Sequence, residues 1–244
     1  MIGAQRPPTP DQAPERTHAA PGPMPRHVVE SVERLAHAIR RRRSAQPFFI
    51  ELAGTPRAGK TTALKSLAAL LQNCDVIVKT VDESAHRCPI PDKRHPAFNL
   101  WTCRTTVHEI LEAQRGDGRV VLIDRGVADA ECWFDWHETR LDSPARVDRT
   151  TLNLTSLAPR VPAMDLVLVM ETDPAVAMQR DGNGSAGSKA GQIMNPVTLA
   201  ELNASIDRTV KRYEALLPLE RLDTTHLTEH EVVSQLIDRA LKHC

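Results

Sequence analysis

The sequence predicts an α/β protein of three layers, in which a five-stranded parallel sheet lies between helices on both faces. Two observations support this fold class. Short, almost entirely apolar runs alternate with longer segments whose apolar residues recur at helical spacing, a pattern typical of a parallel sheet covered on both sides. The length of 244 residues accommodates one domain of about 200 residues and a short appendage.

The chain begins with a segment that we expect to be a disordered tail, residues 1–25. This segment contains seven prolines and almost no large apolar side chains. It cannot bury enough apolar surface to offset the entropy that ordering would remove.

Residues 26–46 are predicted to form an amphipathic helix that precedes the main domain at 47–244. Val28, Val32 and Ile39 fall on one helical face. The helix ends in four arginines, Arg40 to Arg43, which have two interpretations. They either complement the dipole at the helix C-terminus or form a surface that binds an acidic partner.

Five apolar runs account for the sheet. The predicted strands are Phe48 to Ala53, Val76 to Val81, Val120 to Asp124, Leu166 to Glu171 and Leu219 to Asp223. The intervening helices carry apolar stripes, of which the longest runs from Leu199 to Leu217. The last helix begins at Thr228, three residues before Glu231, which is the spacing of a capping box.

A glycine-rich motif directly follows the first strand and precedes a striped helix. Residues 54–62 read Gly-Thr-Pro-Arg-Ala-Gly-Lys-Thr-Thr and match G-x-x-x-x-G-K-[ST]. The glycines allow a tight turn whose amide groups point at phosphates, and the helix adds the positive end of its dipole. The motif therefore predicts a site for the phosphates of ATP, with GTP as the alternative nucleotide.

The motif also assigns the nucleotide-binding residues. Contacts are expected from Gly54, Arg57, Ala58, Gly59, Lys60, Thr61 and Thr62. Lys60 supplies a point charge for the phosphates. Thr61 places its hydroxyl on Mg²⁺, an ion that binds through few protein oxygens and keeps water and phosphate in the rest of its shell.

Charged residues follow the other strands, at the edge of a parallel sheet where ligands gather. Glu83 follows the second strand, and Asp124 and Arg125 end the third. Phosphoryl transfer requires a carboxylate that orients or deprotonates the acceptor, and cations for the transferring group. We expect Glu83 to act as the base. Asp124 is assigned to the Mg²⁺ shell or to the acceptor, and Arg125 to gripping the acceptor, whereas Asp173 is expected to cap a helix.

The phosphate loop, the stretch Glu83 to Arg87 and the stretch Val121 to Gly126 follow one another in the order found in P-loop small-molecule kinases. From Pro47 to Lys242 the chain resembles that superfamily. It is similar to the thymidylate kinase and deoxynucleoside kinase group and to ribosylnicotinamide-kinase-like ATPase domains. The resemblance implies the P-loop NTPase fold, a base or water-mediated Mg²⁺ ligand at Glu83, and acceptor binding by Arg125.

The resemblance further implies a lid between the fourth strand and the next long helix. In this chain the lid would span residues 179–192 and offer Arg180 and Lys189 to the transferring phosphate, in place of an arginine-rich run. The Gly- and Ser-rich part, 181–192, has no apolar period. It is either a functional loop or a flexible surface excursion.

The aromatic residues between the second and fourth strands have two interpretations. Trp101, Trp133, Phe134 and Trp136 lie where the related kinases bind their acceptor. They either stack on an aromatic acceptor or belong to the core, because buried aromatic side chains dominate core packing.

Composition limits the partners. Lys plus Arg and Asp plus Glu each number 31, so no general field favours nucleic acid or an anionic membrane. No apolar run approaches the roughly 20 residues that span a bilayer, and the five cysteines are scattered. We expect a cytoplasmic protein whose partners are a nucleotide and a small-molecule acceptor, without nucleic acid or membrane. The oligomeric state, a homo-oligomer included, stays open.

The leading hypothesis from the sequence is an ATP- and Mg²⁺-dependent kinase of a nucleoside, nucleotide or related metabolite. The alternative is a nucleotide-dependent regulatory ATPase or GTPase switch that binds a protein partner through the arginine-bearing helix.

Overall fold

The computed structural model describes residues 24–140, 163–182 and 193–244. The tail predicted at 1–25 lies almost wholly outside these residues, as does most of the loop predicted at 181–192. None of the described helices is both long and apolar enough to cross a membrane.

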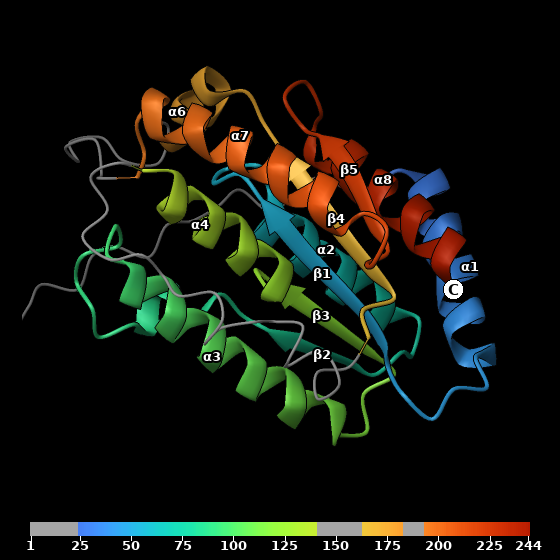
Figure 1. Cartoon of the computed structure of the whole chain (residues 1–244). Coiled ribbons are helices and arrows are strands. Elements are labelled where there is room, and N and C mark those ends of the chain that lie inside the picture. The colour runs from blue at the N-terminus through green and yellow to red at the C-terminus, as the bar shows by residue number, and fades with distance from the viewer. Residues whose placement is uncertain (1–23, 141–162, 183–192) are drawn as a thin grey trace, which may run out of the picture.

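The chain alternates between strands and helices from residue 48 onward (Figure 1). The strands are β1 (Phe48–Gly54), β2 (Val78–Val81), β3 (Val120–Asp124), β4 (Leu166–Glu171) and β5 (Leu219–Asp223). The helices are α1 (Arg26–Arg41), α2 (Lys60–Asn73), the 3₁₀ turn η1 (Ser84–Arg87), α3 (Pro96–Gln114), α4 (Val127–Thr139), α6 (Pro174–Gly182), α7 (Pro196–Tyr213) and α8 (Glu229–His243).

The five strands form one parallel sheet in the order β2-β3-β1-β4-β5. β1 lies in the centre, with Ile50 opposite Leu122 of β3 on one side and Leu166 of β4 on the other. The chain runs from β1 outward to β2, returns through β3, and then crosses to β4 beyond β1. Ligands of open α/β sheets bind at the carboxyl ends of strands flanking such a reversal. The predicted fold class is confirmed.

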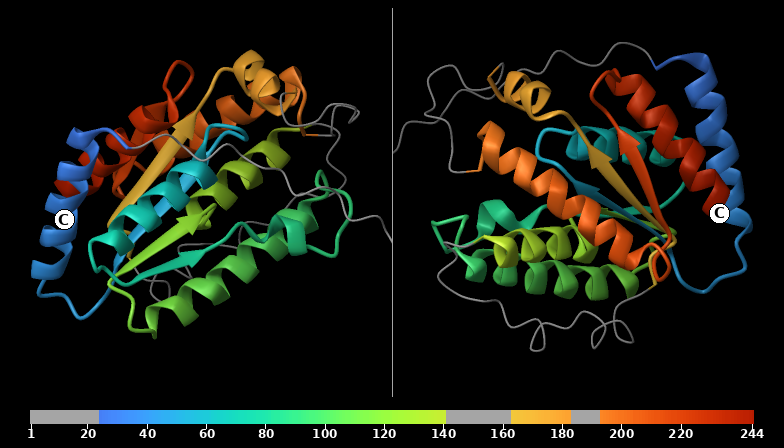
Figure 2. Two further views of the ribbon diagram at one scale, coloured as in Figure 1. Left: turned by 180° about the vertical axis from the view of Figure 1, so that it is seen from behind. Right: turned by 45° about the horizontal axis from the view of Figure 1, so that its top comes forward.

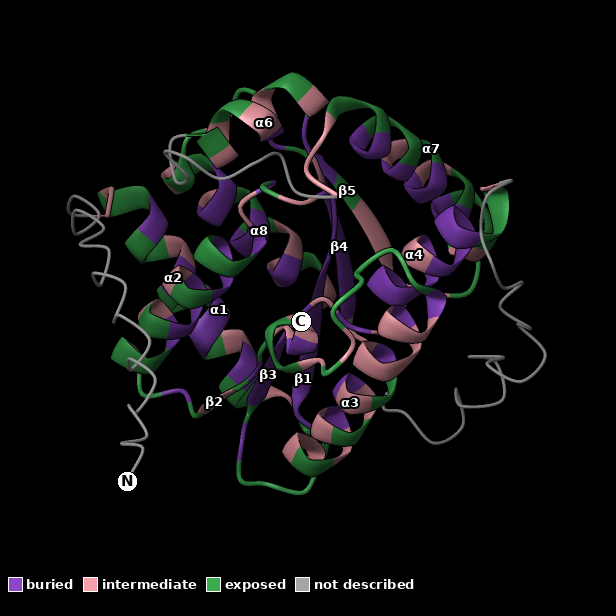
Figure 3. Ribbon diagram, turned by 90° about the vertical axis from the view of Figure 1, so that its left-hand side faces the viewer, coloured by how far each residue is buried: buried purple, intermediate pink, exposed green. Residues whose placement is uncertain are grey.

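Helices cover both faces of the sheet (Figure 2). α1, α2 and α8 pack on one face, around alternate side chains such as Ile50 and Leu52. α4 and α7 pack on the other face beside Ala53 and Val167, while Ile110 of α3 packs on the β2–β3 side. The strands are buried at the centre, and exposed residues lie mainly on the outer sides of the helices (Figure 3).

The N-terminal helix is part of the core. Its residues Val28, Val32, Leu35, Ala36 and Ile39 are buried in the same cluster as apolar residues of α2 and α8. The helix ends at Arg41, earlier than the segment 26–46 assigned to it from the sequence.

Two of the four arginines at the end of α1 contact other parts of the chain. Arg40 donates to the Cys74 carbonyl at 2.5 Å, and Arg42 pairs with Asp165 at 2.8 Å. Arg41 and Arg43 are exposed. The surface available to an acidic partner is therefore smaller than the run Arg40 to Arg43 indicates.

Two boundaries differ from those predicted. The second strand begins at Val78, not at Val76, because the chain leaves α2 through Asp75 in a left-handed conformation (φ 56°) before it enters the sheet. Residues 179–182 of the predicted lid belong to α6, which begins after Asp173. Asp173 accepts a hydrogen bond from the Ala175 amide at 2.8 Å, which confirms its capping role.

Candidate active site

The phosphate loop joins β1 to α2 and depends on two glycines. Gly54 has φ +115°, and a Cβ there would lie 2.1 Å from the Met170 carbonyl oxygen of β4. Gly59 has φ +90° and occupies the N-cap position of α2. These conformations suit glycine because it lacks a Cβ. The loop thus has the close backbone turn that the motif predicts.

Lys60 is buried at the start of α2. Its Nζ donates to the carbonyl oxygens of Gly54 at 2.9 Å and Thr55 at 2.6 Å. Burial and, to a smaller extent, the Arg125 charge lower the pKa of Lys60 to about 8, against the opposing effect of nearby carboxylates. Lys60 is therefore a desolvated cation held over the loop that phosphates would occupy.

The other residues of the loop differ in exposure. Ala58 is buried, and Thr62 lines the cleft described below. Arg57, with φ +64°, pairs through its side chain with Asp181 of α6 at 2.5 Å. Its carbonyl oxygen accepts from Arg180 at 3.2 Å. The loop is thus fastened to α6 at one side.

Thr61 and Asp124 lie together, as the predicted magnesium site requires. The Thr61 hydroxyl donates to Asp124 Oδ2 at 2.5 Å. Asp124 Oδ1 is buried without a hydrogen-bond partner among the described residues, and burial raises the pKa of this carboxyl. Oxygen donors with one unsatisfied carboxylate oxygen fit Mg²⁺, which needs few protein ligands. No group of three or more His, Cys, Asp or Glu side chains that could hold a metal occurs in the part of the chain that the structure describes.

Glu83 and Arg125 form an ion pair beside the loop. Glu83 Oε1 lies 3.0 Å from Arg125 Nε, and Arg125 Nη1 lies 3.0 Å from Asp129 Oδ2. Arg125 has φ +63°, a left-handed conformation that is uncommon for a residue with a side chain. Burial lowers the pKa of Arg125, but the carboxylates of Asp129 and Glu83 raise it more, so the guanidinium stays charged.

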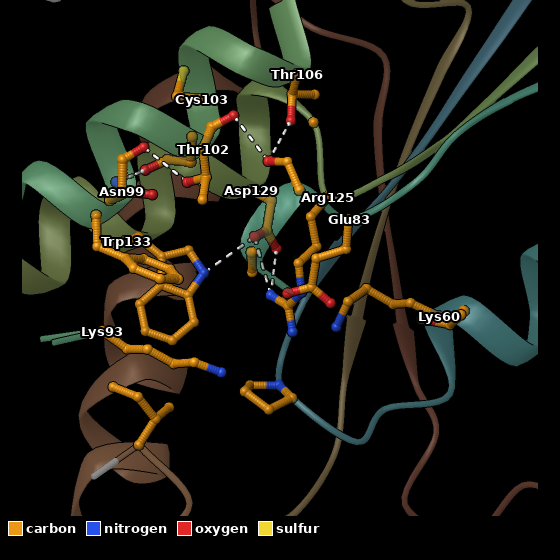
Figure 4. A pocket seen from close by; sticks show the side chains of 18 of the residues that line it. Lys60, Glu83, Lys93, Asn99, Thr102, Cys103, Thr106, Arg125, Asp129 and Trp133 are labelled. Carbon is orange, nitrogen blue, oxygen red and sulfur yellow. Dashed lines mark hydrogen bonds and ion pairs between the residues drawn. The ribbon is translucent and has the colours of Figure 1, made fainter. Parts of the chain in front are cut away.

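These residues line one cleft of about 610 Å³. In Figure 4, Lys60 lies on one side of the cleft, Trp133 and Lys93 lie on the other, and Glu83 and Arg125 lie between them. Asn99, Thr102, Cys103 and Thr106 of α3 and Ala130, Trp133 and His137 of α4 form the wall away from the phosphate loop. The cleft therefore extends from the phosphate loop to a wall formed by α3 and α4.

The aromatic residues divide between the two interpretations given by the sequence. Trp133 lines the cleft, whereas Phe134 and Trp136 are buried in the core. Trp101 does not line the cleft. A single indole ring is thus available to an acceptor.

Arg180 of the predicted lid reaches the phosphate side of the cleft. Its guanidinium donates to the Thr224 carbonyl at 2.7 Å as well as to the Arg57 carbonyl. Lys189 lies outside the described residues. The part assigned to Lys189 stays a prediction.

Sequence reasoning missed two polar residues that line the cleft, and one carboxylate that contacts one of them. Glu51 of β1 and Asp129 and His137 of α4 are all buried. Burial and the neighbouring Asp129 charge raise the pKa of Glu51 to about 7, against hydrogen bonds from the start of α4 that lower it. Burial lowers the pKa of His137 to about 4, and its Nε2 has no hydrogen-bond partner in the described structure. Glu51 carried one signal in the sequence, because it is the only charged residue within a strand that is otherwise apolar.

No protein-family model and no curated protein matches the sequence. Solved structures do match the fold. Deoxyadenosine kinase from M. mycoides, with the products dCMP and a flexible dCDP bound, is 15% identical with a TM-score of 0.58, over 78% of this chain and 97% of that one. The same enzyme with bound dATP is 14% identical with a TM-score of 0.57, over 78% and 98% of the two chains. This chain therefore has the P-loop fold of the deoxynucleoside kinases.

Proposed function

We propose that the protein is an ATP- and Mg²⁺-dependent kinase that phosphorylates a nucleoside, a nucleotide or a related small acceptor. The observation that carries the proposal is the convergence of three groups on one cleft. They are the phosphate loop with Lys60, Thr61 with Asp124 hydrogen-bonded behind it, and the Glu83–Arg125 pair.

The groups fit the requirements of phosphoryl transfer. The loop amides and Lys60 bind the phosphates, and Mg²⁺ held by Thr61 and Asp124 would neutralise charge on the phosphate oxygens. Glu83 accepts the proton of an acceptor hydroxyl as its oxygen attacks the terminal phosphorus, and the bond from that phosphorus to the bridging oxygen breaks to release ADP. Arg125 holds the acceptor near Glu83.

The acceptor end of the cleft supports a flat, partly polar acceptor. Trp133 presents an indole wall, and the neutral imidazole of His137 offers an unsatisfied nitrogen. Aromatic side chains stack on nucleobases irrespective of sequence. The structures with the same fold contain dCMP, dCDP and dATP. Nucleosides are therefore the first acceptors to test, because a hydroxyl acceptor makes use of a base at Glu83.

The test measures ADP formation from Mg-ATP by the purified protein, alone and with pools of nucleosides, nucleotides and vitamin-like metabolites. Stimulation by one pool that Lys60→Ala abolishes is the expected result. The proposal is abandoned if no pool receives phosphate. Steady hydrolysis that no acceptor stimulates would favour the alternative, a nucleotide-dependent switch that binds a protein partner through exposed arginines such as Arg41 and Arg43.

A further inference from the structure

One buried carboxylate contacts three separate parts of the cleft. Asp129 accepts hydrogen bonds from the Gly54 amide at 2.7 Å, from Arg125 Nη1 at 3.0 Å and from Trp133 Nε1 at 3.1 Å. The Asp129 side chain is only 4% exposed. Figure 4 shows Asp129 between Arg125 and Trp133, and its bond to the Gly54 amide joins both to the phosphate loop.

The position of Asp129 is fixed from its own backbone as well. Its amide donates to Glu51 Oε1 at 2.9 Å. The start of α4 lies so close to the Glu51 carboxyl that a Cβ on Gly126 would lie 2.5 Å from it. Because Glu51 belongs to the central strand, these contacts connect the first turn of α4 to the centre of the sheet.

Lys60 links the phosphates to this carboxylate. The Gly54 carbonyl accepts from Lys60 at 2.9 Å, while the Gly54 amide donates to Asp129. Phosphates bound in the loop compete for Lys60 Nζ, since a dianionic phosphate is a stronger acceptor than a peptide carbonyl. Departure of Lys60 changes the field at Gly54, Arg125 and Asp129, all of which lie within its electrostatic reach.

We propose that Asp129 is a positioning residue that couples the phosphate loop to the acceptor wall. Nucleotide binding is transmitted through Asp129 to Trp133 and Arg125, and the acceptor end is aligned only when the phosphate end is filled. This coupling rests on the proposed function for the identity of the two ligands. It is reciprocal, so ATP raises the affinity for the acceptor by the same factor as the acceptor raises the affinity for ATP.

Tryptophan emission tests the coupling without a known acceptor. The full chain is titrated with Mg-ATP, and binding is measured separately by calorimetry. Wild type and Trp133→Phe are compared first, because their difference isolates the emission of Trp133 from that of the other two tryptophans. We expect an ATP-dependent change that Trp133→Phe removes. Binding without any Trp133-dependent change overturns the proposal, whether or not variants of Asp129 fold.

Asp129→Asn then tests the carboxylate itself. We expect it to bind Mg-ATP within about fivefold of wild type but to lose the Trp133 response. Asp135→Asn is the matched control, because Asp135 is equally buried on α4 yet binds Arg208 and Arg212 of α7 away from the cleft. The control should keep the full response. An unchanged response in Asp129→Asn, or its loss in Asp135→Asn alone, overturns the proposal.

The outcomes separate this coupling from the kinase proposal. ATP binding with an intact Trp133 response but no phosphate transfer to any acceptor contradicts the kinase proposal alone. Phosphate transfer without the response contradicts the coupling alone. A wild-type protein that binds neither ATP nor GTP contradicts both.

Discussion

Lys60 is a buried cation at the start of α2, where the loop from β1 ends. Its ammonium group is buried and binds two carbonyl oxygens of its own loop. A buried lysine loses the hydration that stabilises its charge, which explains why its pKa lies at about 8. The phosphates of the proposed nucleotide would supply a counter-charge and raise that pKa. Nucleotide binding above pH 8 would therefore be coupled to proton uptake.

The affinity for ATP should fall as the pH rises above about 8. Free protein then loses the Lys60 proton while the complex retains it, so the dissociation constant rises by up to about tenfold per pH unit. Calorimetric titrations from pH 7 to 9.5 measure this. Lys60→Arg keeps its charge over the range and should give a flat profile; a flat wild-type profile would contradict the prediction.

Glu83→Gln should reduce turnover by roughly 10²- to 10⁴-fold, the usual contribution of a general base. ATP binding should persist, because Glu83 contacts Arg125 and not the phosphate loop. Steady-state kinetics with the identified acceptor measure the loss. Glu109→Gln is the control, since Glu109 pairs with Arg87 and does not line the cleft. Wild-type turnover of the Glu83→Gln variant would contradict the assignment of Glu83 as the general base.

Glu51→Gln should gain stability relative to wild type as the pH rises. The pKa of Glu51 is about 7 in the folded protein, against 4.5 for a glutamate without contacts, as in the unfolded chain. The unfolded chain therefore ionises at lower pH, and the free energy of unfolding of the wild type falls as the pH rises from 4.5 to 7. The full difference is about 3 kcal/mol, at 1.36 kcal/mol per pKa unit. Urea denaturation at pH 5 and pH 8 measures it. Exposed Glu112→Gln should show no such trend, and an equal trend in both variants would contradict the assignment.

The residues that sequence could predict share one property: each belongs to a local motif or directly follows a strand. Lys60, Asp124 and Arg125 are of this kind. Asp129 and Glu51 are not, because their contact joins positions 78 residues apart. From the sequence alone, a carboxylate inside a helix or strand is expected to lie on the surface. Only the tertiary structure shows that another element packs against it. Only the strand's otherwise apolar composition set Glu51 apart.

At the scale of elements, helices with a local capping motif or a clear apolar stripe were predictable, although the end of α1 was predicted too far along the chain. The capping box of α8 is present, with Thr228 accepting from the Glu231 amide and the Glu231 carboxylate accepting from the Thr228 amide. α4 was harder, because it buries Asp129, Glu131, Asp135 and His137 among its apolar residues. A helix that packs against α3, α7 and the sheet has no polar face to give it a clear period.

Thr228→Ala should lower the free energy of unfolding by about 1 kcal/mol, the typical value for an N-cap substitution. The loss arises because the Glu231 amide loses the Thr228 hydroxyl as its acceptor, whereas the Thr228 amide keeps the Glu231 carboxylate. Urea denaturation with an unchanged m-value measures it. Thr105→Ala serves as control, since Thr105 lies within α3 without a side-chain hydrogen bond in the described structure. Equal stability of both variants would contradict the capping role.

At the scale of the whole molecule, the layers and the five-stranded parallel sheet were predictable because alternation of apolar runs is a property of the entire chain. The place of α1 was not. Its apolar stripe predicted a helix, but no local pattern says which elements cover it. The structure shows α8 and α2 in contact with it. The sequence suggested that the N-terminal helix is an appendage to the main domain, whereas its apolar residues pack in the same core as those of α2 and α8.

Two N-terminal deletions should differ in their effect on the melting temperature. Removal of residues 1–23 leaves every described contact in place and should not change the melting temperature. Removal of residues 1–45 uncovers the partners of five buried apolar side chains. At about 1.5–3 kcal/mol each, this loss matches the whole stability of a typical domain. Thermal denaturation by circular dichroism distinguishes them, and cooperative melting of the longer deletion at the wild-type temperature would contradict the structural role of α1.

The contact between α1 and α8 also bears on how the protein is made. The ribosome makes α1 before, and α8 after, the other helices that the structure describes, yet each covers the apolar face of the other. Until α8 has been synthesised, the apolar stripe of α1 therefore lacks its principal packing partner. Contacts between residues so far apart in the sequence slow folding. Nascent chains halted before α8 should expose that stripe to chaperones and proteases. Synthesis of α8, and not of the phosphate loop, is therefore expected to complete the core around α1.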